Sequence, residues 1–240
     1  MKHLLSLLAL SVFSLSVQAT DIRARLGYNI GGITPVSLPN TIRHINSYNP
    51  GFGITAGVDV PFSLSKRWAV SFGLKLENLR MQTDATVKSY HTRITMDGET
   101  IEGYFTGRVR TRANIIYMTM PLLAEYQIND RWTLKAGPYL SFKADATFKG
   151  NVYNGHLRRE TPTGDLVQIG NDNTASYDFS NEVARFGTGL TIAADYRISQ
   201  KWGAYAELDW GLSDTFKKNF TAISFKMYAV HASFGAIYHF

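Results

Sequence analysis

The residues ISFKMYAVHASFGAIYHF (223–240), at the end of the chain, decide the fold. From Tyr228 onward every second residue is apolar or aromatic, and the residues between them are smaller or more polar. A period of two places these two sets on opposite faces of a β-strand. The sequence therefore predicts a terminal strand with one apolar face.

The end of this strand resembles the terminal signal of bacterial outer-membrane barrels. The matching residues are Ser233, Gly235, Tyr238 and the final Phe240. The resemblance implies that the barrel-assembly machinery recognises this strand. An ordinary buried C-terminal strand is the alternative interpretation, and the rest of the chain favours the barrel.

The chain begins with MKHLLSLLALSVFSLSVQA (1–19), a basic residue followed by an apolar run and small residues. This pattern predicts a secretory signal peptide that is cleaved after Ala19, which leaves 20–240 as one barrel domain. The apolar run is shorter than the ~20 residues of a membrane-spanning helix. We therefore expect an exported protein that is either soluble or an outer-membrane β-barrel.

The composition narrows the possible partners. The chain has no cysteine, which excludes a lipid-anchored cysteine, disulfides and thiol chemistry. Its formal charge is +6, but no basic helix or zinc-ligand spacing accompanies the charge. We therefore predict no nucleic-acid partner and expect the excess charge on loops and strand ends that face anionic surfaces.

Three segments repeat one pattern of a polar turn with a basic residue, a tryptophan and then alternation. They begin at residues 63, 127 and 197, and their tryptophans are Trp68, Trp132 and Trp202. Short periplasmic turns, longer external loops and girdles of aromatic residues are typical of outer-membrane barrels. These tryptophans are therefore predicted to form an interface girdle beside short turns.

The alternation predicts an all-β fold, an eight-stranded antiparallel up-and-down transmembrane β-barrel with short periplasmic turns and long external loops. The expected strands are 22–33, 51–63, 68–83, 106–127, 132–148, 183–198, 202–213 and 223–240. The expected turns are 64–67, 128–131 and 199–201, and the expected loops are 34–50, 84–105, 149–182 and 214–222. Alternation that continues through 84–112 suggests that two strands project beyond the membrane.

One face of these strands is apolar and the other carries charge. The charged face holds fourteen residues, seven basic and seven acidic: Arg23, Arg25, Asp59, Lys75, Glu77, Glu125, Lys135, Lys143, Asp145, Arg185, Asp195, Arg197, Glu207 and Asp209. Side chains fill the interior of a small barrel, and buried charges must be paired. The sequence therefore predicts an ion-paired interior rather than an open pore, with a small diffusion pore as the alternative.

Two stretches resemble the PorT-type outer-membrane β-barrel family of Bacteroidota. They are residues 115–142, with MPLL at 120–123 and AGPY at 136–139, and the hairpin 186–214. The resemblance implies a small eight-stranded outer-membrane protein. One branch of that family takes part in type IX secretion and gliding, and no residue here assigns the chain to that branch. Pro121 departs from strand rules, so a bulge or a nearby turn is expected there.

His231 and Ser233 share a face of the last strand, and Glu207 and Asp209 lie on the strand before it. These are the ingredients of a Ser–His–acid site, as in an enzyme that modifies lipid A. The alternation points them into the lumen, where a lipid has poor access, and the assembly signal already accounts for Ser233. We therefore predict no catalytic residues.

The sequence predicts neither a metal site nor a cofactor. His44, His91 and His156 fall in three different loops without metal-ligand spacing. Four basic loop residues are candidates for contact with lipopolysaccharide phosphates, although solvated loops explain them equally well: Arg158, Arg159, Lys217 and Lys218.

Together these features predict a non-enzymatic outer-membrane protein with a structural or interaction role through its external loops. The expected partners are outer-membrane lipids and lipopolysaccharide, the barrel-assembly machinery and an envelope protein. A diffusion pore and a lipid A-modifying enzyme are the alternatives.

Overall fold

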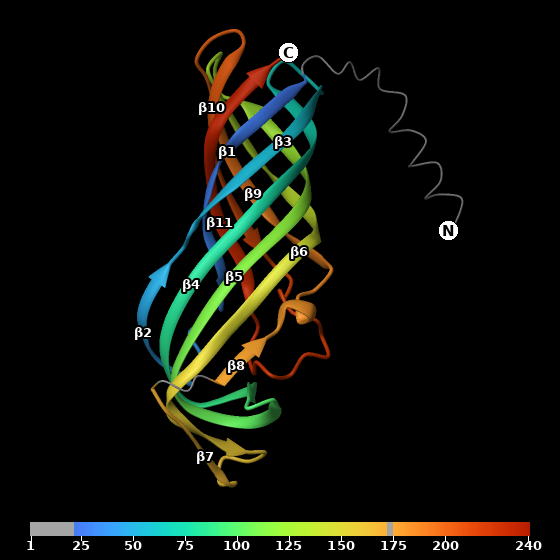
Figure 1. The fold of residues 1–240 in the computed structure, drawn as a ribbon. Coiled ribbons are helices and arrows are strands. Elements are labelled where there is room, and N and C mark those ends of the chain that lie inside the picture. The colour runs from blue at the N-terminus through green and yellow to red at the C-terminus, as the bar shows by residue number, and fades with distance from the viewer. Residues whose placement is uncertain (1–21, 172–174) are drawn as a thin grey trace, which may run out of the picture.

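The computed structural model describes residues 22–171 and 175–240, so the predicted signal peptide lies outside the described residues. The described chain forms strands and one short 3₁₀ turn, η2 (Ser180–Glu182) (Figure 1). The strands are β1 (Arg23–Thr34), β2 (Ile42–Asn49), β3 (Phe52–Ser63), β4 (Trp68–Met96), β5 (Glu99–Gln127), β6 (Trp132–Arg159), β7 (Leu166–Ile169), β8 (Ala175–Asp178), β9 (Phe186–Arg197), β10 (Trp202–Gly211) and β11 (Tyr228–His239). Within the described residues, no helix is long and apolar enough to cross a membrane.

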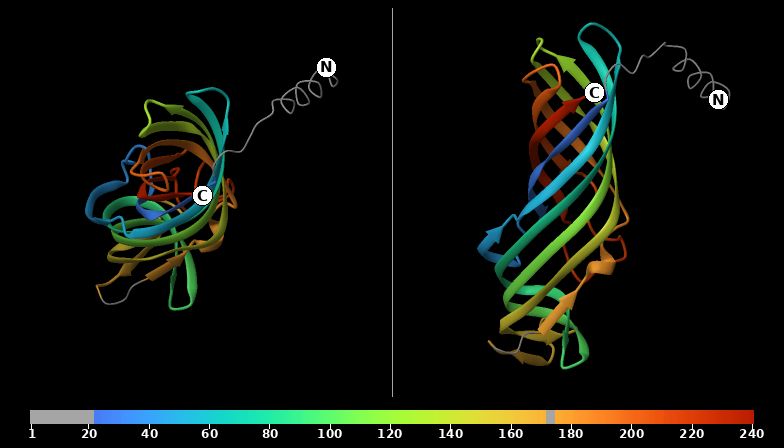
Figure 2. Two further views of the ribbon diagram at one scale, coloured as in Figure 1. Left: turned by 90° about the horizontal axis from the view of Figure 1, so that it is seen from above. Right: turned by 45° about the horizontal axis from the view of Figure 1, so that its top comes forward.

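Eight of these strands close into a ring. The order is β1, β3, β4, β5, β6, β9, β10 and β11, every neighbour pair is antiparallel, and β11 pairs with β1 along its whole length. Figure 2 shows the ring from above and in an oblique view with its terminal end brought forward. The predicted all-β antiparallel architecture is confirmed. The short strands β2, β7 and β8 lie in segments that were predicted to be loops.

The first residues of β1 and the last of β11 lie at one end of the ring, which we call the terminal end (Figure 1). The three predicted short turns are at this end. The amide of each tryptophan that follows a turn donates to a side chain three residues earlier: Ser65 Oγ at 3.2 Å, Asn129 Oδ1 at 2.9 Å and Ser199 Oγ at 3.1 Å. Each turn thus satisfies its own backbone and starts the next strand.

Each of these tryptophans packs on a tyrosine of the neighbouring strand. The ring centroids are 4.8 Å apart in Trp68–Tyr126, 4.8 Å in Trp132–Tyr196 and 5.0 Å in Trp202–Tyr238. Cross-strand aromatic pairs stabilise a sheet and fix its register. The predicted girdle residues therefore lie at a common level near the terminal end.

An apolar band surrounds the ring on its outer face. Its members are exposed, some strongly, as with Phe52 at 68%, and include Leu26, Tyr28, Ile54, Val58, Phe72, Leu74, Leu76, Leu122, Leu134, Leu190, Ile192, Leu208, Trp210 and Phe234. Exposed apolar surfaces of this extent mark a face that meets a partner or a membrane.

The strands β4, β5 and β6 continue far beyond the band. With β2, β7, β8 and residues 212–227 they form a second part of the molecule, here called the outer extension (bottom of Figure 1). The predicted loops 84–105 and 149–182 are therefore largely strand. The tip of the β4–β5 hairpin bends over the end of the ring. Thr95 near this tip pairs with Ser176 of β8, and the ring centroids of Tyr90 and Phe225 are 6.0 Å apart.

A hydrophobic core explains why the outer extension is ordered. The inward residues of its strands are apolar and buried, and they include Val87, Tyr90, Ile94, Ile101, Phe105, Val109, Phe148, Val152, Leu157, Ile169, Tyr177 and Phe179. Residues 223–227 also contribute to this core instead of extending the last strand, so β11 begins at Tyr228 rather than at 223. Burial of these side chains stabilises strands that project beyond the band.

Pro121 does not lie in a bulge. Its pairing with Tyr139 of β6 is in register, and the pairs on either side of it with β4 share one register. Its ring lies against Gly73, where a Cβ atom would approach Pro121 Cγ to 3.0 Å. The bulge occurs five residues earlier, between Ile116 and Tyr117.

The outer core generates a stability prediction. Phe105 is fully buried, at 0% exposure. We expect Phe105→Ala to cost about 3–5 kcal/mol, because it removes buried apolar atoms and leaves a cavity. Hydrogen exchange of the distal amides of β4, β5 and β6 should accelerate, whereas Phe72→Ala, on the exposed band, should leave those amides protected. Equal protection in both variants would show that the extension does not depend on this core.

Candidate functional site

Charged side chains fill the interior of the ring at the level of the band. Nearest the terminal end, three cations and three carboxylates form what we call the terminal cluster: Arg23 and Arg25 of β1, Asp59 of β3, Glu125 of β5, Lys135 of β6 and Asp195 of β9. The alternation of each strand turns these residues inward, and all of them are buried or nearly so.

The ion pairs of the terminal cluster join neighbouring strands as well as strands three places apart in the ring. Arg23 Nη2 lies 2.5 Å from Glu125 Oε1, and Arg25 Nη2 lies 2.6 Å from Asp195 Oδ2. Lys135 Nζ lies 2.6 Å from Asp195 and 3.0 Å from Glu125, while both arginines also contact Asp59. The Arg23–Glu125 and Arg25–Asp195 pairs thus cross part of the lumen, whereas the Lys135–Asp195 and Lys135–Glu125 pairs and the arginine contacts with Asp59 join adjacent strands.

Deeper in the ring lies a second group, the central cluster: Lys75 and Glu77 of β4, Glu207 and Asp209 of β10, and His231 of β11. Lys75 Nζ lies 2.5 Å from Glu207 Oε1 and 2.6 Å from Asp209 Oδ2. Because β4 and β10 are diametrically opposite in the ring of eight, this contact spans the lumen. Buried charges persist only when they are paired and hydrogen-bonded in this way.

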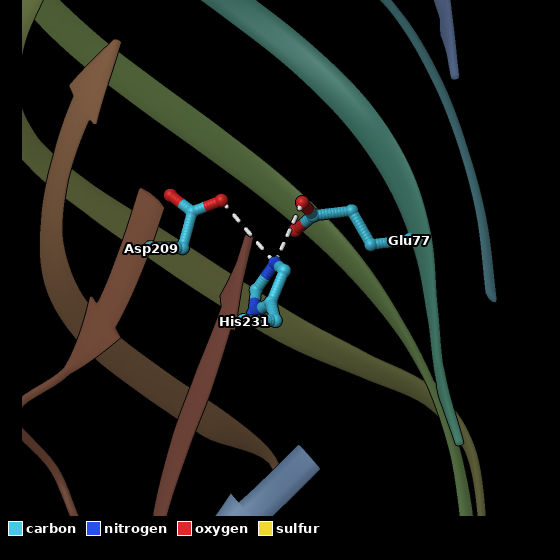
Figure 3. Close-up of side chains that lie close together, drawn as sticks. All are labelled: Glu77, Asp209 and His231. Carbon is cyan, nitrogen blue, oxygen red and sulfur yellow. Dashed lines mark hydrogen bonds and ion pairs between the residues drawn. The ribbon is translucent and has the colours of Figure 1, made fainter. Parts of the chain in front are cut away.

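His231 completes the central cluster. Its Nε2 atom lies 3.2 Å from Glu77 Oε1 and 3.2 Å from Asp209 Oδ2, as Figure 3 shows. Thr191 Oγ1 also donates to Asp209. The imidazole therefore ties the last strand to β4 and β10 through two carboxylates.

Glu77, Asp209 and His231 have the composition of a metal-ligand set. One ligand atom from each lies within 4.8 Å of the others. The Lys75 ammonium already occupies this position, because its Nζ lies 2.9 Å from Glu77 and 2.6 Å from Asp209. A divalent cation would have to displace it, so the absence of a resident metal stays our prediction. Sequence reasoning missed this set because its members are far apart in the chain.

The Ser–His–acid arrangement is assembled only in part. Asp209 contacts the His231 imidazole, but Ser233 Oγ and His231 Nδ1 are buried without a hydrogen-bond partner among the described residues. A nucleophilic serine requires a hydrogen bond to its base. The geometry therefore gives Ser233 no activating group.

Four of the predicted interior charges lie elsewhere. Asp145 and Arg185 are exposed, and Lys143 is half-buried and donates to the Val183 carbonyl at 2.9 Å. The bulge between Ile116 and Tyr117 explains Asp145, because it changes the face that β6 presents beyond Lys143. Arg185 precedes β9, so the alternation of that strand does not turn its side chain inward. Arg197 is exposed at the terminal end, with Nη2 3.5 Å from His239 Nδ1.

The predicted assembly-signal residues occupy the seam between β11 and β1. Ser233 is buried, and Gly235 lies opposite Gly27, where a Cβ atom would meet the Leu26 carbonyl oxygen at 2.1 Å. Tyr238 packs on Trp202, and the exposed Phe240 ring lies 5.0 Å from Tyr238. Gly235 is thus required by the close approach of two strands.

The four loop cations proposed for phosphate contact do not form one group. Arg158 donates to the Gly164 carbonyl at 3.2 Å, and Arg159 lies 3.2 Å from Glu99. Lys217 lies 3.8 Å from Glu182, in a segment of the outer extension distinct from the end of β6. Three of the four cations therefore have contacts within the protein, and Lys218 is exposed with no such contact among the described residues.

A different group of cations borders the apolar band on the extension side. Arg80 of β4, Arg110 and Arg112 of β5 and Lys149 of β6 point outward, and we call them the basic collar. Arg110, Arg112 and Lys149 line a hollow of about 570 Å³ with Asn151 and Tyr153. The collar falls on positions that sequence reasoning had placed in loops or strand ends, so it was not recognised as one surface.

Asp84 anchors the strands around the collar. It is only 4% exposed and accepts hydrogen bonds from Asn46 of β2, Arg108 and Arg110 of β5 and Tyr153 of β6. Burial acts to raise the pKa of Asp84, but the hydrogen bonds from Tyr153, Arg108 and Asn46 outweigh it and hold the pKa below its usual range. The carboxylate thus stays charged and links four strands.

The sequence also matches a family model. The model describes the outer membrane protein beta-barrel domain, and the match covers residues 17–217. The chain belongs to this family. It matches no curated protein. Membership accounts for the closed ring, the apolar band on its outside and the charges inside, and it indicates the bacterial outer membrane.

Solved outer-membrane proteins are similar to this family member. CarO2 of Acinetobacter baumannii is 12% identical, with a TM-score of 0.44 over 92% of this chain and 100% of that chain. The attachment invasion locus protein Ail of Yersinia pestis is 12% identical, with a TM-score of 0.40 over 93% and 100%. OprG of Pseudomonas aeruginosa is 13% identical, with a TM-score of 0.35 over 93% and 97%. Similarity at this level carries no inference about function.

The central cluster generates a prediction. We expect Lys75→Met to destabilise the folded protein by about 3–5 kcal/mol, because it leaves three buried carboxylates without their shared cation. The protein is unfolded with urea in lipid vesicles. Electrophoresis of unboiled samples then gives the fraction that still migrates as folded protein at each urea concentration. Lys88→Met, at an exposed position of the outer extension, is the control. Identical unfolding midpoints for the two variants would contradict the account.

Proposed function

We propose that this outer-membrane β-barrel protein acts without catalysis, as an interaction protein whose lumen is closed and whose contacts are made by the outer extension. The observation that carries this proposal is the Lys75–Glu207 ion pair between opposite strands, together with the terminal cluster. Diffusing solutes would have to break buried ion pairs to pass. A small diffusion pore is the alternative, and the vestibule of about 200 Å³ at the terminal end, which Glu125 and Asp195 help to line, favours it in part.

The orientation follows from the two ends of the ring. Outer-membrane barrels have short periplasmic turns and longer extracellular segments. The terminal end, with its three short turns and the Trp–Tyr pairs, is then periplasmic, and the outer extension is extracellular. The apolar band faces lipid, and the predicted signal peptide exports the chain. The machinery that assembles barrels recognises β11.

The finer family assignment is also a proposal. The MPLL and AGPY motifs support a PorT-type protein of Bacteroidota, and the outer extension supports contact with an envelope protein. Involvement in type IX secretion predicts that other envelope subunits copurify with the protein. Purification of a monomer alone from native membranes would oppose that involvement.

The basic collar favours lipopolysaccharide as a partner. Leu76 belongs to the band and Arg80 follows four residues later, about 13 Å along the strand at ~3.3 Å per residue. This short distance, reduced further by the tilt of the strands, supports contact between the collar and headgroup phosphates. Arg112 lies directly opposite Lys149 on the outward face, where like charges repel each other, and Asp178 Oδ2, 3.1 Å from Lys149 Nζ, offsets only part of the repulsion. Phosphate groups relieve this repulsion, and arginine binds them through paired hydrogen bonds.

Charge removal tests this proposal. We expect the double variant Arg80→Gln/Arg112→Gln to retain several-fold less lipopolysaccharide after extraction, measured by native mass spectrometry. The control, Lys66→Gln/Arg67→Gln, removes the same charge from a turn at the terminal end. Equal retention by both variants, or no preference of the wild-type protein for phosphorylated over dephosphorylated lipid A, would refute the phosphate contact.

A further inference from the structure

The wall of the ring has a gap where it meets the outer extension. On one side β1 pairs with β11 as far as Thr34, but its other neighbour, β3, begins at Phe52 opposite Ile30. The next segment, β2, pairs with β4 alone. Figure 1 shows β2 diverging from the ring at this point. The last residues of β1 therefore have no strand beside them on that side.

The hydrogen bonding of β1 reflects this gap. The Ile33 amide donates to Met81 Sδ at 3.2 Å. A thioether is a weak hydrogen-bond acceptor. If a strand lay beside β1 here, the Ile33 amide would donate to a backbone carbonyl of that strand instead. The gap is thus a built feature of the wall, with an apolar side chain where a neighbouring strand would lie.

An apolar pocket of about 110 Å³ lies behind the gap. Its inner wall includes Met81, Val87, Val109, Phe148 and Met227, and its mouth is formed by Leu38, Ile45, Tyr48 and Phe225. Charged residues are absent from its lining in the part of the chain that the structure describes. An apolar cavity of ~150 Å³ stays dry and binds benzene, so a pocket of this size accepts a small apolar group.

The surroundings of the pocket indicate the shape of its ligand. Leu38, 59% exposed, Val36 and Ile45 continue the apolar lining outward, and Phe52 of the band is the first residue beyond the gap. An elongated ligand whose end fills the pocket can therefore continue outward along an apolar path. Inward, Leu79 and its partner Ile115 are buried, and Leu79 separates Met81 of the pocket from Glu77 of the central cluster along β4.

We propose that this pocket binds the end of an alkyl chain. A short saturated chain matches its volume, its lack of charge and its open mouth. The chain can come from a free fatty acid or from the acyl group of a neighbouring lipid, and only the second source rests on the membrane orientation proposed above. The pocket retains a ligand but does not conduct it, since buried side chains close its inner end.

Photo-crosslinking tests this inference on the full mature chain in phosphatidylcholine vesicles. One arm adds decanoic acid with a terminal diazirine, and the other uses vesicles whose lipid carries a terminal diazirine on one acyl chain. Mass spectrometry then maps the adducts. We expect adducts at pocket residues such as Met81, Val109 and Phe225, and unlabelled decanoate should compete for them. Adducts from the first arm assign a free ligand, and adducts from the second assign a leaflet lipid.

Matched variants decide whether the pocket is responsible. Ala85 lines the pocket, so Ala85→Phe fills it and should lower pocket adducts by about tenfold, equivalent to ~1.4 kcal/mol of lost affinity. Ala136→Phe adds the same ring to the exposed face of β6 and should change nothing. Leu38→Asn makes the exposed mouth more polar without changing a buried side chain, and it should also reduce labelling. Pocket adducts that are absent in both arms, or that persist in Leu38→Asn and in folded Ala85→Phe, would overturn the proposal.

This test is independent of the function proposed above. Loss of lipopolysaccharide retention would refute the phosphate contact without affecting pocket adducts. Absence of pocket adducts would refute alkyl binding and leave the closed lumen intact.

Discussion

The structure depends on one constraint, namely that charges removed from water inside a narrow ring must find partners across it. An eight-stranded barrel has an interior just wide enough for side chains to fill. The terminal and central clusters meet the constraint with pairs between strands three or four places apart in the ring, such as Lys135–Asp59 and Lys75–Glu207. The pairing that makes the charges tolerable is therefore also what we propose closes the lumen.

The interior changes character along its length. Ion pairs fill it at the level of the outer apolar band, and an apolar core fills it inside the outer extension. This arrangement suits the surroundings proposed for each part. Where lipid covers the outside, the interior is the polar side of every strand, and where water covers the outside, the interior is the apolar side. The reversal lets β4, β5 and β6 pass through both parts as continuous strands.

The outer extension gives the protein two surfaces with different chemistry near the edge of the band. The basic collar, on β4, β5 and β6, suits phosphate, and the pocket between β1 and β2 suits an alkyl chain. Lipids of the outer leaflet carry both groups. The closed lumen and the lipid contacts that we propose would together describe a protein that works at its surface.

Alternation with a period of two predicted the strands of the ring, the short turns and ten of the inward charges. It predicted them because lumen and lipid impose opposite chemistry on successive residues. It failed where that contrast ends. The bulge at Ile116 and Tyr117 turned Asp145 outward, and it leaves no simple sequence signal. Residues 149–159 looked like a loop because their outward face is polar, whereas the alternation through 84–112 did predict that two strands extend past the band, as β4 and β5 do.

The central and collar groups could not have been predicted in detail. Glu77, Asp209 and His231 come from three strands, and only the closed ring order brings them together. The basic collar likewise depends on the register between β5 and β6, which sets Arg112 opposite Lys149. The serine or asparagine three residues before each tryptophan was visible in the sequence, and its hydrogen bond explains why the three turns share one form.

Single-channel conductance of the refolded mature protein in a planar bilayer tests the closed lumen most directly. The account predicts no steady conductance for the wild-type protein. It also predicts openings when Lys75 and Arg25 are replaced by alanine in protein that still migrates as folded, because the pairs that cross the lumen are then lost. Stable openings of the wild-type protein would contradict the account and identify a diffusion pore whose interior charges act as its selectivity filter.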